Sequence, residues 1–92
     1  MNSEYYSLDL IVEKLNKHKQ RATYGAVAGV LRKLPISLMK GYEKCPRYSW
    51  IVSEKTDRPT DYTVEQLHPE LDSKTFTIKT SKNLIEWLMK NP

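Results

Sequence analysis

A run of small residues in the first third of the chain limits what this protein can fold into. Residues 23–31 read Thr-Tyr-Gly-Ala-Val-Ala-Gly-Val-Leu, so four of these nine residues are glycine or alanine. A helix with so little side-chain volume lets another helix or a phosphate backbone approach its main chain closely. The segment therefore predicts a tight helix contact or a contact with a polyanion.

Two residues mark where this helix begins and where the next one can begin. Thr23 has the side chain of an N-cap, and Pro35 cannot continue a helix that starts there. Pro35 is instead suited to the first turn of a following helix, residues 36–41, because its missing N–H would be unpaired there anyway. We expect a helix, a short turn and a second, shorter helix.

Helical patterns also lie at both ends of the chain. Apolar residues recur with helical spacing over residues 7–18, and Ser7 can serve as the N-cap. A second amphipathic pattern follows Ser81, which we expect to cap the last helix. The chain thus predicts three to four helices.

The remaining segments predict strands. Residues 48–52 are rich in β-forming side chains, residues 55–59 are turn formers, and residues 60–64 can return beside the first strand. We therefore expect a β-hairpin there and a further strand over residues 75–79. Residues 65–74 show no pattern that assigns them to an element.

Length and cysteine content point to one domain in a reducing compartment. The 92 residues provide for a single core, so residues 1–92 form one domain. Helices, a helix-turn-helix and a hairpin predict an α+β fold of the small winged helix-turn-helix type, with an α+β interaction domain as the alternative. Cys45 is the only cysteine and no apolar run is long enough to span a bilayer, which predicts a cytoplasmic protein.

Positive charge is concentrated in one third of the chain. The formal net charge is +4, yet residues 14–47 carry nine Lys and Arg side chains against one acidic residue, Glu43. A basic cluster in a small domain is the electrostatic footprint of a polyanion binder, with a solvated basic face as the alternative. Double-stranded DNA is therefore the partner that the sequence favours.

A resemblance to a known family supports this partner. Thr23-Tyr24-Gly25 opens the small-residue helix, Pro35 follows it, and Gly41 ends the next segment. This layout resembles the helix-turn-helix of the alkylguanine-DNA alkyltransferases and of their non-enzymatic relatives, the alkyltransferase-like proteins, over residues 8–64. The resemblance implies a winged helix-turn-helix that binds duplex DNA, with Tyr24 at the target phosphate.

The catalytic strip of that family is not matched. The family has Pro-Cys-His-Arg-Val, whereas Tyr48 and Ser49 stand here at the cysteine and histidine positions. Alkyl transfer needs a thiolate activated by a neighbouring histidine, so we expect no enzyme, and Cys45 is expected to be an ordinary structural or surface cysteine. His18 and His68 lack ligand partners at metal-site spacing, so neither a metal nor another cofactor is expected.

The candidate DNA contacts come from the basic segment and the two predicted helices. Lys and Arg position a protein on DNA mainly through phosphate oxygens, and hydroxyl groups add to them. Leu38 or Met39 is a candidate apolar wedge in the minor groove, which base flipping at a damaged base would need. The candidate contacts are Arg21, Thr23, Tyr24, Arg32, Lys33, Ser37, Lys40, Lys44 and Arg47.

A protein-interaction module or adaptor is the alternative function. The small-residue helix and exposed aromatic side chains would then contact a protein, while Trp50 is expected in the core. The two functions differ in salt dependence, because phosphate contacts release counterions and a largely apolar interface does not.

Overall fold

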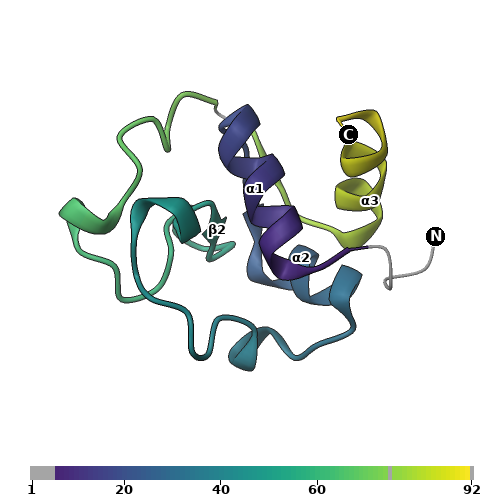
Figure 1. Ribbon diagram of the computed structural model, residues 1–92, viewed down its shortest axis with the longest axis horizontal. Coiled ribbons are helices and arrows are strands. Elements are labelled where there is room, and N and C mark those ends of the chain that lie inside the picture. The colour runs from purple at the N-terminus through teal and green to yellow at the C-terminus, as the bar shows by residue number, and fades with distance from the viewer. Residues whose placement is uncertain (1–5, 75, 92) are drawn as a thin grey trace.

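Three α-helices and a three-stranded parallel sheet form the α+β fold (Figure 1). The computed structural model describes residues 6–74 and 76–91. None of the helices in these ranges is long and apolar enough to cross a bilayer. The elements are α1 (Leu8–His18), β1 (Arg21–Thr23), α2 (Tyr24–Leu31), the 3-10 turns η2 (Pro35–Ser37) and η3 (Pro46–Tyr48), β2 (Ile51–Val52), the 3-10 turn η4 (Val64–Gln66), β3 (Thr77–Ile78) and α3 (Ser81–Lys90).

Each α-helix begins after a hydroxyl side chain that caps its first turn. Ser7 caps α1 and Thr23 caps α2, each accepting a hydrogen bond from a backbone N–H three residues later. The cap of α3 is Thr80. The predicted caps of the first two helices are confirmed, whereas Ser81 is the first residue of α3 and not its cap.

The sheet corrects the predicted hairpin. Strand β1 lies in the middle, and β2 and β3 both run parallel to it, with Ala22 opposite Ile51 on one side and Ile78 on the other. Residues 60–64 are described and contain no strand. The physical reason is that residues 53–58 form a closed turn with internal hydrogen bonds. The Asp57 N–H donates to the Ser53 carbonyl, and the Ser53 N–H donates to the Arg58 carbonyl.

The predicted second helix of the helix-turn-helix is also shorter than expected. Only the 3-10 turn η2 forms within the segment, without a side-chain cap, and the chain then turns until Gly41 takes a φ of +87°. Of the predicted strand over residues 75–79, only Thr77–Ile78 forms a strand, β3, while Thr75 lies outside the described residues. The β-hairpin wing is therefore replaced by a parallel sheet and a series of 3-10 turns.

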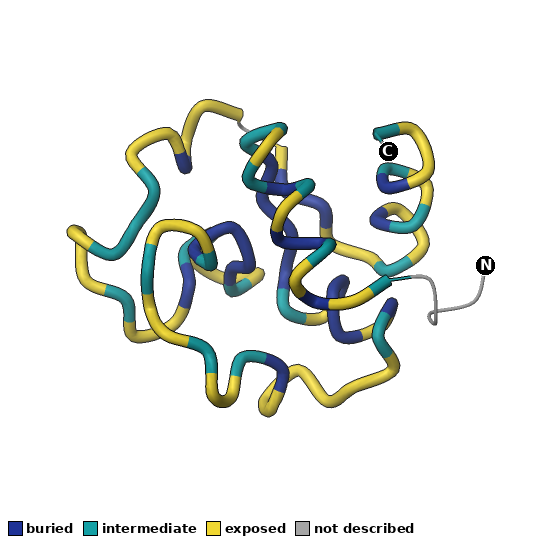
Figure 2. The backbone as a smooth tube through the Cα atoms, in the orientation of Figure 1, coloured by how far each residue is buried: buried dark blue, intermediate teal, exposed yellow. Residues whose placement is uncertain are grey.

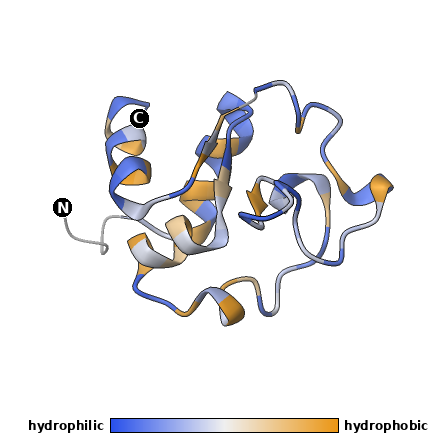
Figure 3. Cartoon of the chain, turned by 180° about the vertical axis from the view of Figure 1, so that it is seen from behind, coloured by the Kyte–Doolittle hydropathy of each residue, from blue (hydrophilic) through white to orange (hydrophobic). Residues whose placement is uncertain are grey.

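The core lies between the sheet and the three helices, as the buried segments in Figure 2 show. Trp50 is fully buried there, as predicted, and its indole N–H donates to the Asn16 side chain at 2.8 Å. The apolar faces of α1 and α3 are turned towards this core, and their polar faces are outside (Figure 3). The buried apolar side chains of the helices include Ile11, Val12, Leu15, Val27, Val30, Leu84 and Leu88.

The small residues of α2 allow a close contact with α3. A Cβ atom placed on Gly29 would lie 2.7 Å from the Cβ atom of Ser81, the first residue of α3. Real Cβ atoms do not approach each other so closely, so a side chain at this position would force the two helices apart. One face of the small-residue helix thus serves helix packing.

Substitution of Gly29 by Ala is expected to lower the free energy of unfolding by about 1–3 kcal/mol, because overpacking outweighs the better helix propensity of alanine. Gly25→Ala is the matched control, since its nearest neighbour outside the helix backbone is the Thr23 hydroxyl at 4.0 Å. The control should gain about 0.5–1 kcal/mol. Urea denaturation of both variants tests the contact, and equal stability of the two would contradict it.

His18 connects α1 to α3. Its ring meets the Trp87 ring edge-on at 5.5 Å, and its buried Nε2 has no hydrogen-bond partner among the described residues. Burial lowers the pKa of His18 below 6.5, and the positive charges of Lys17, Lys74 and Lys14 lower it further. The folded protein therefore holds this imidazole neutral.

This lowered pKa predicts a loss of stability in acid. The unfolded chain binds a proton on His18 as the pH falls below 6.5, and the folded chain resists it, so stability drops through that window. Denaturation at pH values on both sides of the window should show a smaller drop for His18→Phe, which keeps an aromatic ring. A drop of the same size in both proteins would contradict the assignment.

Candidate nucleic-acid interface

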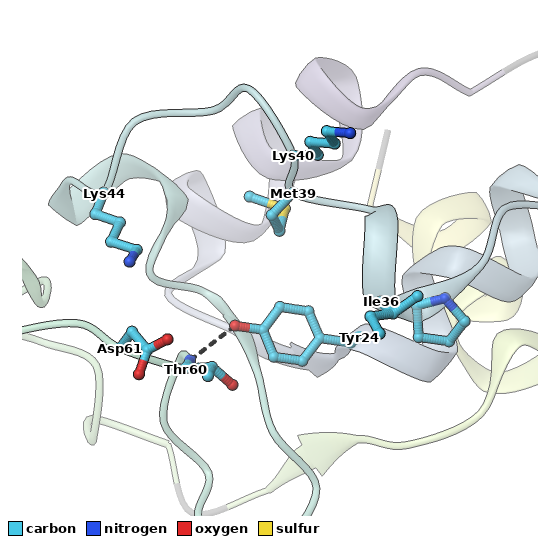
Figure 4. A pocket seen from close by; sticks show the side chains of 8 residues that line it. Tyr24, Ile36, Met39, Lys40, Lys44, Thr60 and Asp61 are labelled. Atoms are coloured by element: carbon cyan, nitrogen blue, oxygen red, sulfur yellow. Dashed lines mark hydrogen bonds between the residues drawn. The ribbon is translucent and has the colours of Figure 1, made fainter.

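A pocket lies where α2 begins, beside η2 and the loop at residues 60–61 (Figure 4). Its volume is about 460 Å³. The Tyr24 ring spans it, and the Tyr24 hydroxyl accepts a hydrogen bond from the Thr60 N–H at 2.8 Å. The lining residues are Tyr24, Pro35, Ile36, Met39, Lys40, Lys44, Thr60 and Asp61.

The lining of the pocket combines an apolar part with charge. Pro35, Ile36 and Met39 supply the apolar part, whereas Lys40 and Lys44 add two positive charges against the one negative charge of Asp61. Figure 4 shows Lys44 and Asp61 on the side of the Tyr24 hydroxyl. Such a surface suits a flat or apolar group that carries negative charge next to it.

Tyr62 belongs to the same region and was not singled out from the sequence. Burial raises the pKa of Tyr62 to about 12, and Cys45 and Tyr24 add to the shift. The phenol therefore stays protonated at neutral pH and is a hydrogen-bond donor, not a base. Its proximity to Tyr24 depends on how the loop at residues 60–61 packs against the start of α2, and that packing is a tertiary contact.

Two of the predicted DNA contacts are buried. Arg21 is 5% exposed and donates to the Asp72 carboxylate at 3.2 Å and to the Lys74 carbonyl at 3.0 Å. Thr23 is buried as the cap of α2. Burial assigns both side chains to the fold, because a phosphate of DNA could not reach them without an opening of the structure.

The other predicted basic contacts are exposed. Their segment, residues 32–47, runs along one edge of the molecule (Figure 1) and holds one acidic residue, Glu43. None of its five basic side chains forms an ion pair with a residue in the described ranges, whereas Lys19, Arg21 and Arg58 do. These five are Arg32, Lys33, Lys40, Lys44 and Arg47.

The remaining predicted contacts lie beside this segment or within it. Tyr24 is half-buried in the pocket. Ser37 is exposed, and its hydroxyl donates to the Leu34 carbonyl at 3.2 Å. The structure thus brings Tyr24, Lys40 and Lys44 together at the pocket and leaves Arg32 and Lys33 at the end of α2.

The structure corrects one of the two predicted apolar wedges. Leu38 is 3% exposed and cannot reach a groove, whereas Met39 is half-buried, packs against the core and lines the pocket. Ile36 is instead 93% exposed and lines the pocket. The sequence predicts an α-helix over residues 36–41. The 3-10 turn η2 forms there instead and exposes different side chains.

The residues at the family's catalytic positions have structural contacts. The Tyr48 hydroxyl donates to the Asp9 carboxylate at 3.3 Å. The buried Ser49 hydroxyl donates to the Pro46 carbonyl at 2.7 Å and accepts from the His68 N–H. In the part of the chain that the structure describes, no group of three or more His, Cys, Asp or Glu side chains is placed to hold a metal ion.

Arg21→Ala is expected to lower the free energy of unfolding by about 1–3 kcal/mol, because the Lys74 carbonyl and Asp72 lose a charged donor. The exposed Lys40→Ala is the matched control and should change stability by less than about 0.5 kcal/mol. Chemical denaturation of both variants measures this difference in the free energy of unfolding. A stability loss of the same small size in both variants would contradict the structural role of Arg21.

Comparison of the chain with protein-family models, curated proteins and solved structures gave no match. The resemblance to the alkyltransferase-like proteins therefore stays a prediction.

Proposed function

We propose that the protein binds duplex DNA without covalent chemistry, through residues 32–47 and the adjacent pocket. The observation that carries the proposal is the set of five exposed basic side chains in this segment, none of them ion-paired with a described residue. Such side chains are free to replace the counterions of a phosphate backbone. Arg21 and Thr23, the two buried residues among the predicted contacts, are not part of the proposed surface.

The arrangement of α2 and η2 supports a reduced helix-turn-helix. Helix α2 is followed by a left-handed residue, Arg32, and then by η2, which begins at Pro35. We place η2 on the duplex in the position of a short recognition element, with Arg32 and Lys33 on one side and Lys40 and Lys44 on the other. In this proposal the β-hairpin wing has no counterpart.

The pocket gives the proposal a second component, the sensing of a damaged base. Its apolar lining and the Tyr24 ring suit a base that leaves the stack, and Lys40 and Lys44 suit the phosphates beside it. Because Tyr48 and Ser49 have structural contacts, the base would be bound and not chemically changed. Tighter binding to a damaged duplex is the result that this component requires.

A protein partner is the second candidate function, and the exposed apolar side chains favour it. Leu34 is 69% exposed beside Ile36. Such side chains can anchor a protein interface, but the five basic side chains of the same segment oppose an uncharged partner. The salt dependence of binding separates the two candidates.

The test is a fluorescence-anisotropy titration of a short duplex over a range of salt concentrations. About five phosphate contacts predict a log-log slope of affinity against salt near −4 to −5, and Lys40→Ala or Lys44→Ala should reduce the slope by about one. Lys90→Ala, an exposed lysine in the last turn of α3, is the matched control and should leave the slope unchanged. A second duplex with an alkylated guanine tests base sensing, which Tyr24→Ala should weaken.

No binding at low salt would overturn the DNA proposal and favour a protein partner. Equal binding to both duplexes would overturn the sensing component and leave a general DNA-binding protein. Slopes that fall equally in all three lysine variants would show that the DNA contact is not confined to residues 32–47.

A further inference from the structure

The most exposed large apolar side chain among the described residues lies within the basic segment. Ile36 is 93% exposed, and Leu34 beside it is 69% exposed. Single apolar side chains on a surface are ordinary, but these two flank Pro35 between Arg32–Lys33 and Lys40. Any polyanion that binds those cations therefore also contacts these two apolar side chains.

The turn that carries Ile36 is held at both of its ends. The Ser37 N–H and the Ser37 hydroxyl both donate to the Leu34 carbonyl, at 3.1 and 3.2 Å, and the Leu38 N–H donates to the Pro35 carbonyl at 3.3 Å. Pro35 restricts its own φ, and the buried side chain of Leu38 anchors the turn to the core. The backbone that carries Ile36 is thus held in a defined position, which lowers the ordering cost of binding.

Phosphate contacts alone would not distinguish one DNA sequence from another. An apolar side chain that enters the minor groove partly unstacks a base step and kinks the duplex. Pyrimidine–purine steps such as TA resist this deformation least, whereas A-tracts are stiff. An apolar wedge beside basic side chains therefore converts non-specific attraction into a preference for flexible DNA.

We infer that Ile36 acts as such a wedge and makes the protein select duplexes with a deformable pyrimidine–purine step. The inference rests on the proposed DNA binding. It assigns selectivity to the shape and stiffness of DNA, with no hydrogen bond to a base edge. Lys40 and Lys44 provide the affinity for DNA, and Ile36 determines which DNA sites are preferred.

The test compares two duplexes of equal length, one with a central TA step and one with a central A-tract, in anisotropy titrations at low salt. The wild-type protein should bind the TA duplex about five- to tenfold more tightly, since the deformation energy depends on the step. A 2-aminopurine next to the TA step should brighten as the step unstacks. Ile36→Ala should bind both duplexes equally, with the salt slope of the wild type and without the fluorescence increase.

Ile36→Ala is expected to fold normally because the side chain buries almost no surface. Val64→Ala is the matched control, since Val64 is a β-branched side chain 83% exposed in η4 and does not line the pocket. It should keep both the preference and the fluorescence change. Equal binding of the wild type to both duplexes, or an Ile36→Ala variant that keeps the preference, would overturn the inference and leave DNA binding intact. Absence of binding to either duplex would overturn the proposed function and the inference with it.

Discussion

Strand β1 is the element on which the other parts of the fold depend. It has three residues, yet both other strands pair with it, and its last residue, Thr23, caps α2 directly. The Gln20 side chain just before it donates to the Phe76 carbonyl at 2.8 Å, and Arg21 binds Asp72 and Lys74. Chain segments that are more than fifty residues apart in sequence are thereby joined at one short strand.

This central strand also determines which charges remain available for a partner. Asp72 accepts from Arg21 at 3.2 Å and from Arg58 at 2.6 Å, so one carboxylate joins β1 to the loop after β2. The exposed cations of residues 32–47 lie outside this network. A fold of this size can thus use some of its basic side chains in ion pairs and leave others for binding, and Arg21 is the one among the ion-paired side chains that is buried.

Much of the helical structure could be predicted from local patterns. Ser7 and Thr23 each precede an apolar pattern of helical spacing and have a side chain that can accept a first-turn N–H, and both are caps. The candidate site was predictable in part, since Lys40, Lys44 and Tyr24 meet at the pocket. Ile36 was not, because its exposure depends on η2 forming in place of an α-helix.

The sequence by itself determined the positions of the three α-helices and the concentration of basic residues in residues 14–47, because hydrophobic spacing, caps and charge are local properties. Only the tertiary structure decided the strand pairing, since β1 is too short to be seen in a pattern and its partners are distant in sequence. The tertiary structure likewise decided that Arg21 is buried and that Ile36 is exposed. Whether a side chain is buried or exposed is decided by what packs over it, and that contact comes from elsewhere in the chain.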